Sequence, residues 1–127
     1  MANLSFSADA GFANGTYHVG LSLIEFKEED VTVIYSPAFD LSGYGYSGKE
    51  ALDSFSVAFH EFMTYTHNKK TLNKILLKLG WQLKGSQKKP KFNPPKDSEL
   101  IATNKTYSEI VNNKDYKVSR GKVELAY

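Results

Sequence analysis

In this 127-residue chain, a strand pattern that runs directly into a marked helix start limits the possible folds. Residues 31–35, Val-Thr-Val-Ile-Tyr, are β-branched or aromatic and predict a strand. The glycine-bearing stretch 43–48 follows, and within it Ser47 stands three residues before Glu50. This is capping-box spacing, in which the serine hydroxyl and the glutamate carboxylate each accept a backbone amide. The sequence therefore predicts a sharp strand-to-helix boundary at residue 47.

The helix that follows Ser47 has one apolar face. Its large apolar residues recur at steps of three and four, namely Leu52, Phe55, Phe59, Phe62 and Met63. Polar residues such as Asp53, His60 and Glu61 fall on the opposite side. This period predicts a long amphipathic helix whose apolar stripe packs on the sheet that precedes it.

Three short strands are predicted ahead of this helix. Residues 17–26 alternate between apolar and small or polar side chains, the acidic cluster 27–30 marks a turn, and 31–35 form the next strand. A third strand, broken by glycine and lying at an edge, is expected over 41–46. We therefore predict an α+β fold: a three-stranded antiparallel meander with one long helix on one face (β-β-β-α) and the other face open.

The second half of the chain is less clearly patterned. A second helix is expected over 72–79, ending at Gly80, whose lack of a side chain suits a left-handed helix terminus. Residues 84–96 form a connector rich in lysine, and its three prolines argue against regular structure. Thr106 and Glu109 repeat the capping-box spacing, and residues 116–127 alternate as a terminal strand or an extended arm.

This pattern divides the chain into two expected parts. A β-β-β-α-α core is predicted over residues 1–80, of which 1–16 carry no clear pattern and are possible disordered sequence. An accessory basic segment is predicted over residues 81–127, joined through the connector 84–96. Order within 84–96 is left open.

Composition narrows the classes of function. The chain has no cysteine, which excludes disulfides, thiolate metal sites and a cysteine nucleophile. The three histidines, His18, His60 and His67, share no metal-ligand spacing, and the carboxylates do not supply the converging set that a two-metal nuclease needs. We expect a non-enzymatic protein without cofactor or metal. Without a signal-peptide pattern or an apolar run of about 18 residues, a cytoplasmic location is predicted.

Charge is distributed unevenly along the chain. Residues 1–67 hold two lysines against nine carboxylates, a net of −7, whereas residues 68–127 hold fourteen basic residues against five carboxylates, a net of +9. Two interpretations remain open. The halves neutralise each other within a monomer or dimer, or the molecule carries an acidic surface on one side and a basic surface on the other.

A family resemblance covers residues 17–66. The acidic turn 28–30, the strand 31–37 ending in proline, the loop 40–45 and the helix entry 47–52 resemble, in that order, the core of HicB-like antitoxins. The resemblance implies a partial RNase H fold of three antiparallel strands and a helix. It also implies a protein that binds and blocks a small basic ribonuclease toxin of the HicA type, often as a homodimer.

Two candidate surfaces follow from these patterns. For a protein partner we predict the acidic turn and the sheet edge, with the candidate residues Glu28, Glu29, Asp30, Asp40, Tyr44 and Tyr46. The alternative is a nucleic-acid-associated protein that uses the basic half, with the candidate residues Lys84, Lys88, Lys89, Lys91 and Lys96. In that alternative Trp81 and Phe92 stand among the lysines as possible base-stacking residues. A third possibility is a HicB-fold protein without a toxin-antitoxin role.

Overall fold

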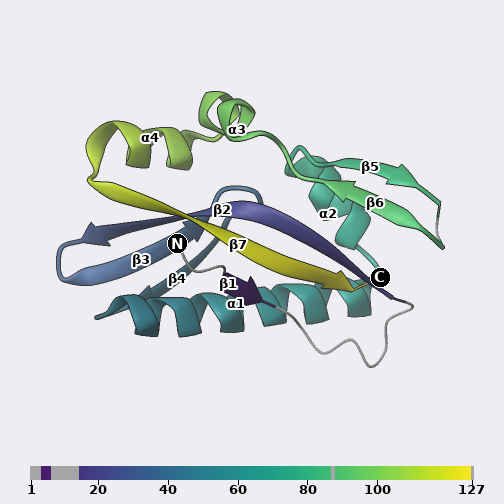
Figure 1. Ribbon diagram of the computed structural model, residues 1–127, viewed down its shortest axis with the longest axis horizontal. Helices are drawn as coiled ribbons and strands as arrows, with labels where there is room; N and C mark the ends of the chain where they lie inside the picture. The colour runs from purple at the N-terminus through teal and green to yellow at the C-terminus, as the bar shows by residue number, and fades with distance from the viewer. Residues whose placement is uncertain (1–3, 7–14, 87, 127) are drawn as a thin grey trace.

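The structure is a computed structural model that describes residues 4–6, 15–86 and 88–126, and it shows an α+β fold built on a five-stranded sheet (Figure 1). The strands are β1 Leu4–Phe6, β2 Thr16–Glu28, β3 Val31–Ser36, β4 Leu41–Gly45, β5 Gln82–Gly85, β6 Pro90–Asn93 and β7 Tyr116–Ala126. The helices are α1 Gly48–Lys69, α2 Leu72–Lys78, α3 Asp97–Thr103 and α4 Lys105–Asn113. The main sheet has the order β1-β7-β2-β3-β4, and β5 pairs with β6 in a separate ribbon.

The predicted antiparallel meander followed by a long helix is confirmed. β2 pairs with β3 from Ile24 opposite Tyr35 to Glu28 opposite Val31, and β3 pairs with β4 in the same antiparallel sense. Glu29, in the turn between β2 and β3, has a positive φ of 55°. Helix α1 then lies along one face of the sheet (Figure 1).

Helix α1 begins where the capping pattern predicts. The Ser47 side chain accepts a hydrogen bond of 3.2 Å from the Glu50 amide. The Glu50 carboxylate differs from the capping-box expectation by one residue, because it accepts from the Tyr46 amide at 2.7 Å. The apolar stripe is fully buried at Phe55 and Phe59. The long helix is therefore held at its start by side-chain caps and along its length by the sheet.

Strand β7 lies inside the sheet, between β1 and β2. It pairs antiparallel with β2 along the whole strand, from Thr16 opposite Ala126 to Phe26 opposite Tyr116. Its side chains Val123 and Leu125 are completely buried in the same core as α1. The expected division into a core 1–80 and an accessory segment 81–127 is therefore corrected, because a central strand comes from the second part.

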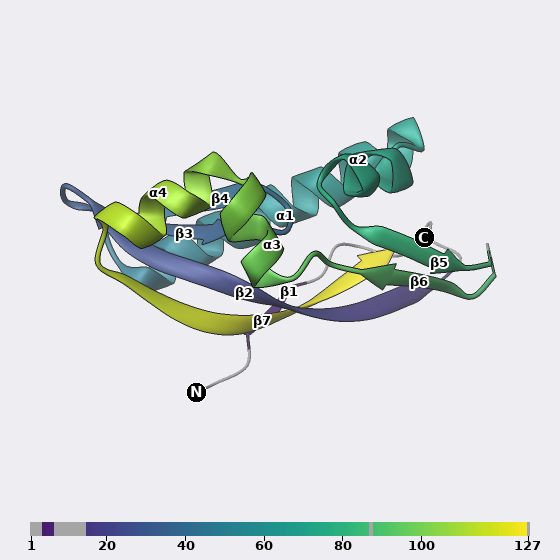
Figure 2. The ribbon, with the colours of Figure 1, turned by 90° about the horizontal axis from the view of Figure 1, so that it is seen from above.

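The face of the sheet opposite α1 is covered. Figure 1 shows α1 on one side of the sheet with α3 and α4 on the other, and Figure 2 shows these two helices lying over β2 and β3. Leu100 of α3 and Tyr107 and Ile110 of α4 are buried. The expectation of an open second face is wrong, because the middle of the sheet is apolar on both faces: the consecutive β2 residues Leu23 and Ile24 point to opposite faces, and both are buried.

Residues 84–96 are also more regular than expected. β6 begins at Pro90, which lacks an amide but occupies the first position of the strand, and Pro94 and Pro95 follow its end. The hairpin packs on the body of the protein through Phe92, whose ring meets that of Tyr17 edge to face at 5.4 Å. The prolines therefore bound a short strand and leave its pairing intact.

Two further local predictions differ in outcome. The second helix ends as expected, with Gly80 at a φ of 93°. The cap of α4 is Asn104, whose side chain accepts from the Tyr107 amide at 3.1 Å, and Thr106 lies within the helix.

Of residues 1–16, the structure describes β1, which pairs parallel with β7, and residues 15 and 16; the remainder lies outside the described residues. In the described part of the chain, no helix combines the length and apolarity needed to cross a membrane.

Candidate functional site

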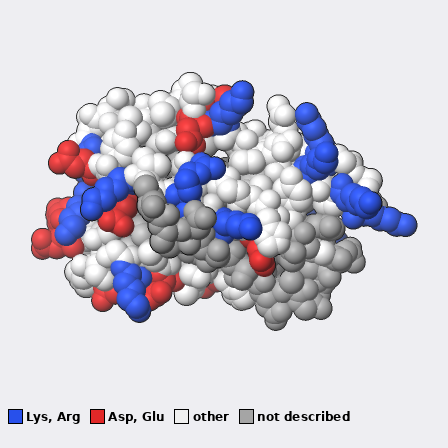
Figure 3. Space-filling model, viewed as in Figure 1, with Lys and Arg blue, Asp and Glu red and all other residues white. Residues whose placement is uncertain are grey.

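The uneven charge of the sequence becomes a division between two ends of the molecule. Residues 62–96 contain nine lysines and no carboxylate, and they form the end of α1, helix α2 and the β5–β6 hairpin. Figure 3 shows basic side chains without acidic neighbours at the hairpin end, whereas acidic side chains gather, mixed with lysines, at the opposite end. We call the region formed by residues 62–96 the basic end. We call the opposite region, around Glu28, Glu29 and Asp30 at the β2–β3 turn, the acidic end.

A lysine of the second half neutralises a carboxylate of the first half at one described place. Lys114 Nζ lies 2.8 Å from Glu28 Oε2, and it is the one described lysine that pairs with a carboxylate of residues 1–67 from the other half. The pairs Lys49–Asp53 and Lys105–Glu109 each lie within a single helix. The geometry therefore favours separate acidic and basic surfaces over mutual neutralisation.

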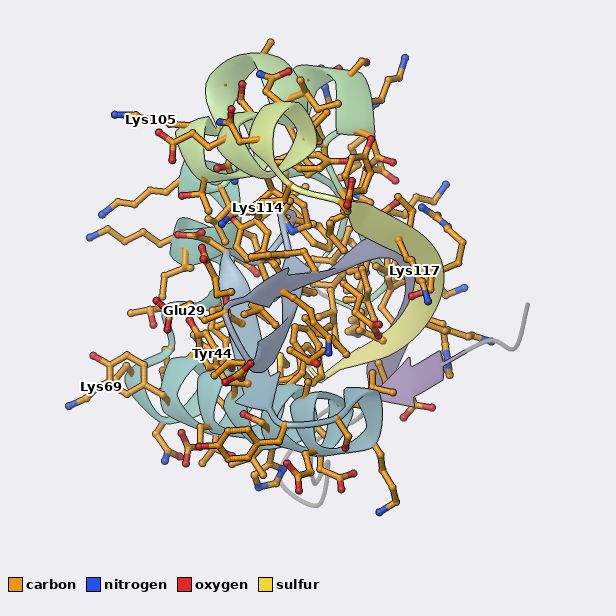
Figure 4. The ribbon with its side chains drawn as sticks, turned by 90° about the vertical axis from the view of Figure 1, so that its left-hand side faces the viewer. Glu29, Tyr44, Lys69, Lys105, Lys114 and Lys117 are labelled. Atoms are coloured by element: carbon orange, nitrogen blue, oxygen red, sulfur yellow. The ribbon has the colours of Figure 1, made fainter. Side chains whose placement is uncertain are left out.

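The acidic end brings together five of the six residues predicted for a protein partner. Glu28, Glu29 and Asp30 are exposed at the turn between β2 and β3. Thr32 is paired with Gly45, which places Tyr44 and Tyr46 on the strand and turn beside them. Figure 4 views this end and shows Glu29 and Tyr44 at the sheet, with Lys114 on the side of α4.

The two tyrosines are unusually exposed for aromatic side chains. Tyr44 is 59% and Tyr46 78% accessible. Their backbone amides, however, are occupied: Tyr44 donates to Ser54 Oγ at 3.0 Å and Tyr46 to Glu50 at 2.7 Å. Since unpaired amides are what an edge strand offers to a further strand, this edge is protected. A contact here is more suited to side chains than to strand addition.

Asp40 is not part of the acidic end. It follows the other end of β3 and accepts a hydrogen bond of 2.6 Å from the Tyr35 hydroxyl, which in turn accepts from Asn104 Nδ2 at 2.8 Å. Burial of the ring, and then the bond to Asp40, raise the pKa of Tyr35 far above its usual value. Tyr35 therefore links β3 to Asn104 at the start of α4, and Asp40 is bound to the same hydroxyl, so its predicted role at the partner surface is not supported by its position.

A second polar network, between the sheet and α3, was not predicted from the sequence. Arg120, the single arginine of the chain, donates from Nη1 to Ser22 Oγ at 3.0 Å, and Ser22 donates to Asp97 Oδ2 at 2.8 Å. These groups line a cavity of about 310 Å³ between the sheet and α3. The only sequence signal was a lone arginine in an alternating strand, which does not show that Ser22 and Asp97 stand beside it.

The lysine-rich candidates lie on the hairpin and just after it. Lys84, Lys88, Lys89, Lys91 and Lys96 are all exposed. The proposed stacking residues are not available, since Trp81 and Phe92 are each 2% accessible and Trp81 Nε1 donates to the Ala38 carbonyl at 2.8 Å. The basic end therefore offers positive charge without aromatic platforms.

The described residues contain no group of three His, Asp or Glu side chains that could hold a metal ion. His18 lies 3.7 Å from Glu124, and both side chains are about half exposed. Comparison with protein-family models, curated proteins and solved structures finds no match to this chain. The two charged ends are thus the candidate functional sites.

Proposed function

We propose that this chain is a non-catalytic binding protein that uses its acidic end to sequester a small basic protein. A ribonuclease toxin of the HicA type is the partner that the sequence resemblance implies. A nuclease that grips RNA phosphates needs a cationic surface, and an acidic surface complements it in orientation and in the rate of encounter.

The observation that carries the proposal is the strand register at the acidic end. Because Thr32 pairs with Gly45, the exposed Tyr44 and Tyr46 stand next to the carboxylates of the β2–β3 turn. Tyrosine is enriched at the centres of protein interfaces, where the ring is buried on binding and the hydroxyl keeps a polar partner. The exposed carboxylates beside these tyrosines supply polar groups for the rim of such an interface.

Charge at this end is cancelled only in part within the molecule. Glu28 is paired with Lys114, but Glu29 and Asp30 make no ion pair within the described residues. The meander of β2, β3 and β4, followed by the long helix α1, agrees with the three antiparallel strands and helix that the resemblance implies. The proposal therefore also rests on the carboxylates without ion pairs and on this agreement in fold.

The test begins with the gene beside the one for this chain. If a short reading frame there encodes a small basic protein, that protein is co-expressed with a tag and this chain is purified with it. The variant Glu29→Lys/Asp30→Lys with Tyr46→Ala is expected to lower retention by at least about tenfold, since two charges are reversed and an exposed aromatic side chain is lost. The matched control is Glu61→Lys/Glu99→Lys, which reverses two exposed carboxylates elsewhere.

Two outcomes would overturn the proposal. Retention that is equal in the variant and the wild type would exclude the acidic end as the contact. A partner that does not co-purify with either protein would leave the third possibility, a HicB-fold protein without this role.

A further inference from the structure

Two lysines face each other across the β5–β6 hairpin. The pairing places Lys84 directly opposite Lys91, so both side chains leave the same face of the ribbon. Like charges in this position lower the stability of a strand pair. Neither lysine makes an ion pair within the described residues, so no carboxylate there offsets the repulsion.

The two faces of this hairpin differ completely in chemistry. Leu83 pairs with Phe92 on the inner face, where Phe92 is buried against the body of the protein. Gln82 pairs with Asn93 on the outer face, beside the lysine pair. The outer face thus carries only hydrogen-bond donors and acceptors and positive charge.

The turn of the hairpin extends this positive face. Lys88 and Lys89 are exposed there, and neither is paired with a carboxylate among the described residues. On the protein side, helix α2 adds the exposed Lys74 and Lys78. Four lysines therefore lie on a ribbon that projects from the body (Figures 1 and 2), and no acidic residue occurs between residues 62 and 96.

We propose that the outer face of the β5–β6 hairpin binds the phosphate backbone of nucleic acid, through Lys84, Lys91, Lys88 and Lys89. Phosphate groups spaced along a strand relieve the repulsion between the facing lysines, and counterions released from the nucleic acid drive the association. The surface is distinct from the acidic end, so it serves a second partner of the opposite charge.

The chemistry of the face also sets what kind of recognition it provides. Lysine ammonium groups are point charges without the planar fork that arginine uses for bidentate base contacts. The nearby aromatic rings of Trp81 and Phe92 are buried, which removes base stacking. Binding through this face is therefore independent of sequence and steeply dependent on salt.

The experiment measures binding of the full chain to two fluorescent probes, a 20-nucleotide single-stranded RNA and a 20-base-pair DNA duplex, at several salt concentrations. With four phosphate contacts, affinity for the duplex falls about 100-fold between 50 and 200 mM salt, from a slope of about 0.9 per contact. The variant Lys84→Gln/Lys91→Gln is expected to reduce that slope by about 2, and the single-strand slope by about 1.4. The matched control, Lys27→Gln/Lys49→Gln, removes two exposed lysines from the acidic end and should leave both slopes unchanged.

Thermal unfolding separates a lost contact from a lost fold. Because Lys84→Gln/Lys91→Gln removes a repulsive pair, its unfolding midpoint should equal or exceed that of the wild type. The proposal is overturned if neither probe binds at 50 mM salt, or if the variant and the control lose affinity equally. It is also overturned if sedimentation at low salt shows self-association that the variant abolishes, because the basic face would then contact the acidic end of another copy.

Discussion

The backbone amide of Tyr44 on β4 donates a hydrogen bond of 3.0 Å to the Oγ of Ser54 on α1. Together with the Glu50 contact to the Tyr46 amide, it ties the edge strand to the helix beneath it. An edge strand that already uses its amides is a poor template for another strand. The same geometry holds the exposed tyrosines of the acidic end in place.

Ser54→Ala should loosen this edge without damaging the core. We expect the free energy of unfolding to fall by about 0.5–1 kcal/mol, the usual net contribution of a neutral hydrogen bond. Exchange of the Tyr44 amide, measured by NMR, should become faster. Ser56→Ala makes the same change within α1, and a Tyr44 exchange rate that matches in the two variants would contradict the role of Ser54.

Gly43→Ala should be among the most damaging small substitutions. An added Cβ at Gly43 would overlap the backbone of α1 at the Ala51 carbonyl and the Phe55 amide, so the helix would have to move away from β4. We expect a loss of about 2–3 kcal/mol in urea unfolding, as for overpacked cores.

Gly20→Ala is the control for that substitution. Its added Cβ would lie 3.5 Å from Arg120 Nη2, which is an ordinary contact with a side chain. Its change in unfolding free energy should stay within about 1 kcal/mol. Equal losses at the two glycines would show that close packing of α1 on β4 does not set the cost.

Leu125→Ala should lower the stability of the whole molecule, because β7 is an interior strand of the main sheet. Leu125 is fully buried, and truncation of such a side chain typically costs about 2–5 kcal/mol. Fluorescence of the single tryptophan, Trp81, and far-ultraviolet circular dichroism should report the same shifted transition. Val118→Ala on the same strand, where the side chain is 41% exposed, should cost less than about 1 kcal/mol.

The Tyr35 hydroxyl should make stability fall at alkaline pH. Its pKa is raised in the folded protein by burial and by Asp40, so the folded state holds this proton when the unfolded state, with a pKa of about 10, has lost it. The contribution is fully present below pH of about 10 and declines by up to about 1.4 kcal/mol per pH unit above it.

Tyr35→Phe isolates this effect from other groups. The difference in unfolding free energy between the wild type and the variant should shrink as pH rises from 9 to 11, measured by urea unfolding at each pH. Tyr107, whose pKa is also raised chiefly by burial, is present in both proteins and cancels. A difference that is constant over this range would show that the proton of Tyr35 is not held by the fold.

Features that depend on neighbouring residues could be predicted from the amino-acid sequence. Ser47 marks the start of α1, Gly80 follows the end of α2, and the period of phenylalanines predicts which face of α1 is buried. These signals are local, since caps, turns and helical periods are set by residues within a few positions of one another. The excess of negative charge before residue 67 and of positive charge after it is likewise a property of the sequence.

The partners against which those elements pack became visible with the three-dimensional fold. β7 pairs with β2 across 90 to 110 residues, from Phe26 opposite Tyr116 to Thr16 opposite Ala126, and no local pattern specifies a partner at that distance. Alternation along β2 could not show that α3 and α4 cover its second face, nor that Asp40 is bound to Tyr35 at the end of β3 opposite to the acidic turn. The tertiary structure also sets the lysine-rich segment 62–96 and the acidic β2–β3 turn at separate ends of the molecule, because the packing of the whole chain fixes where each segment lies.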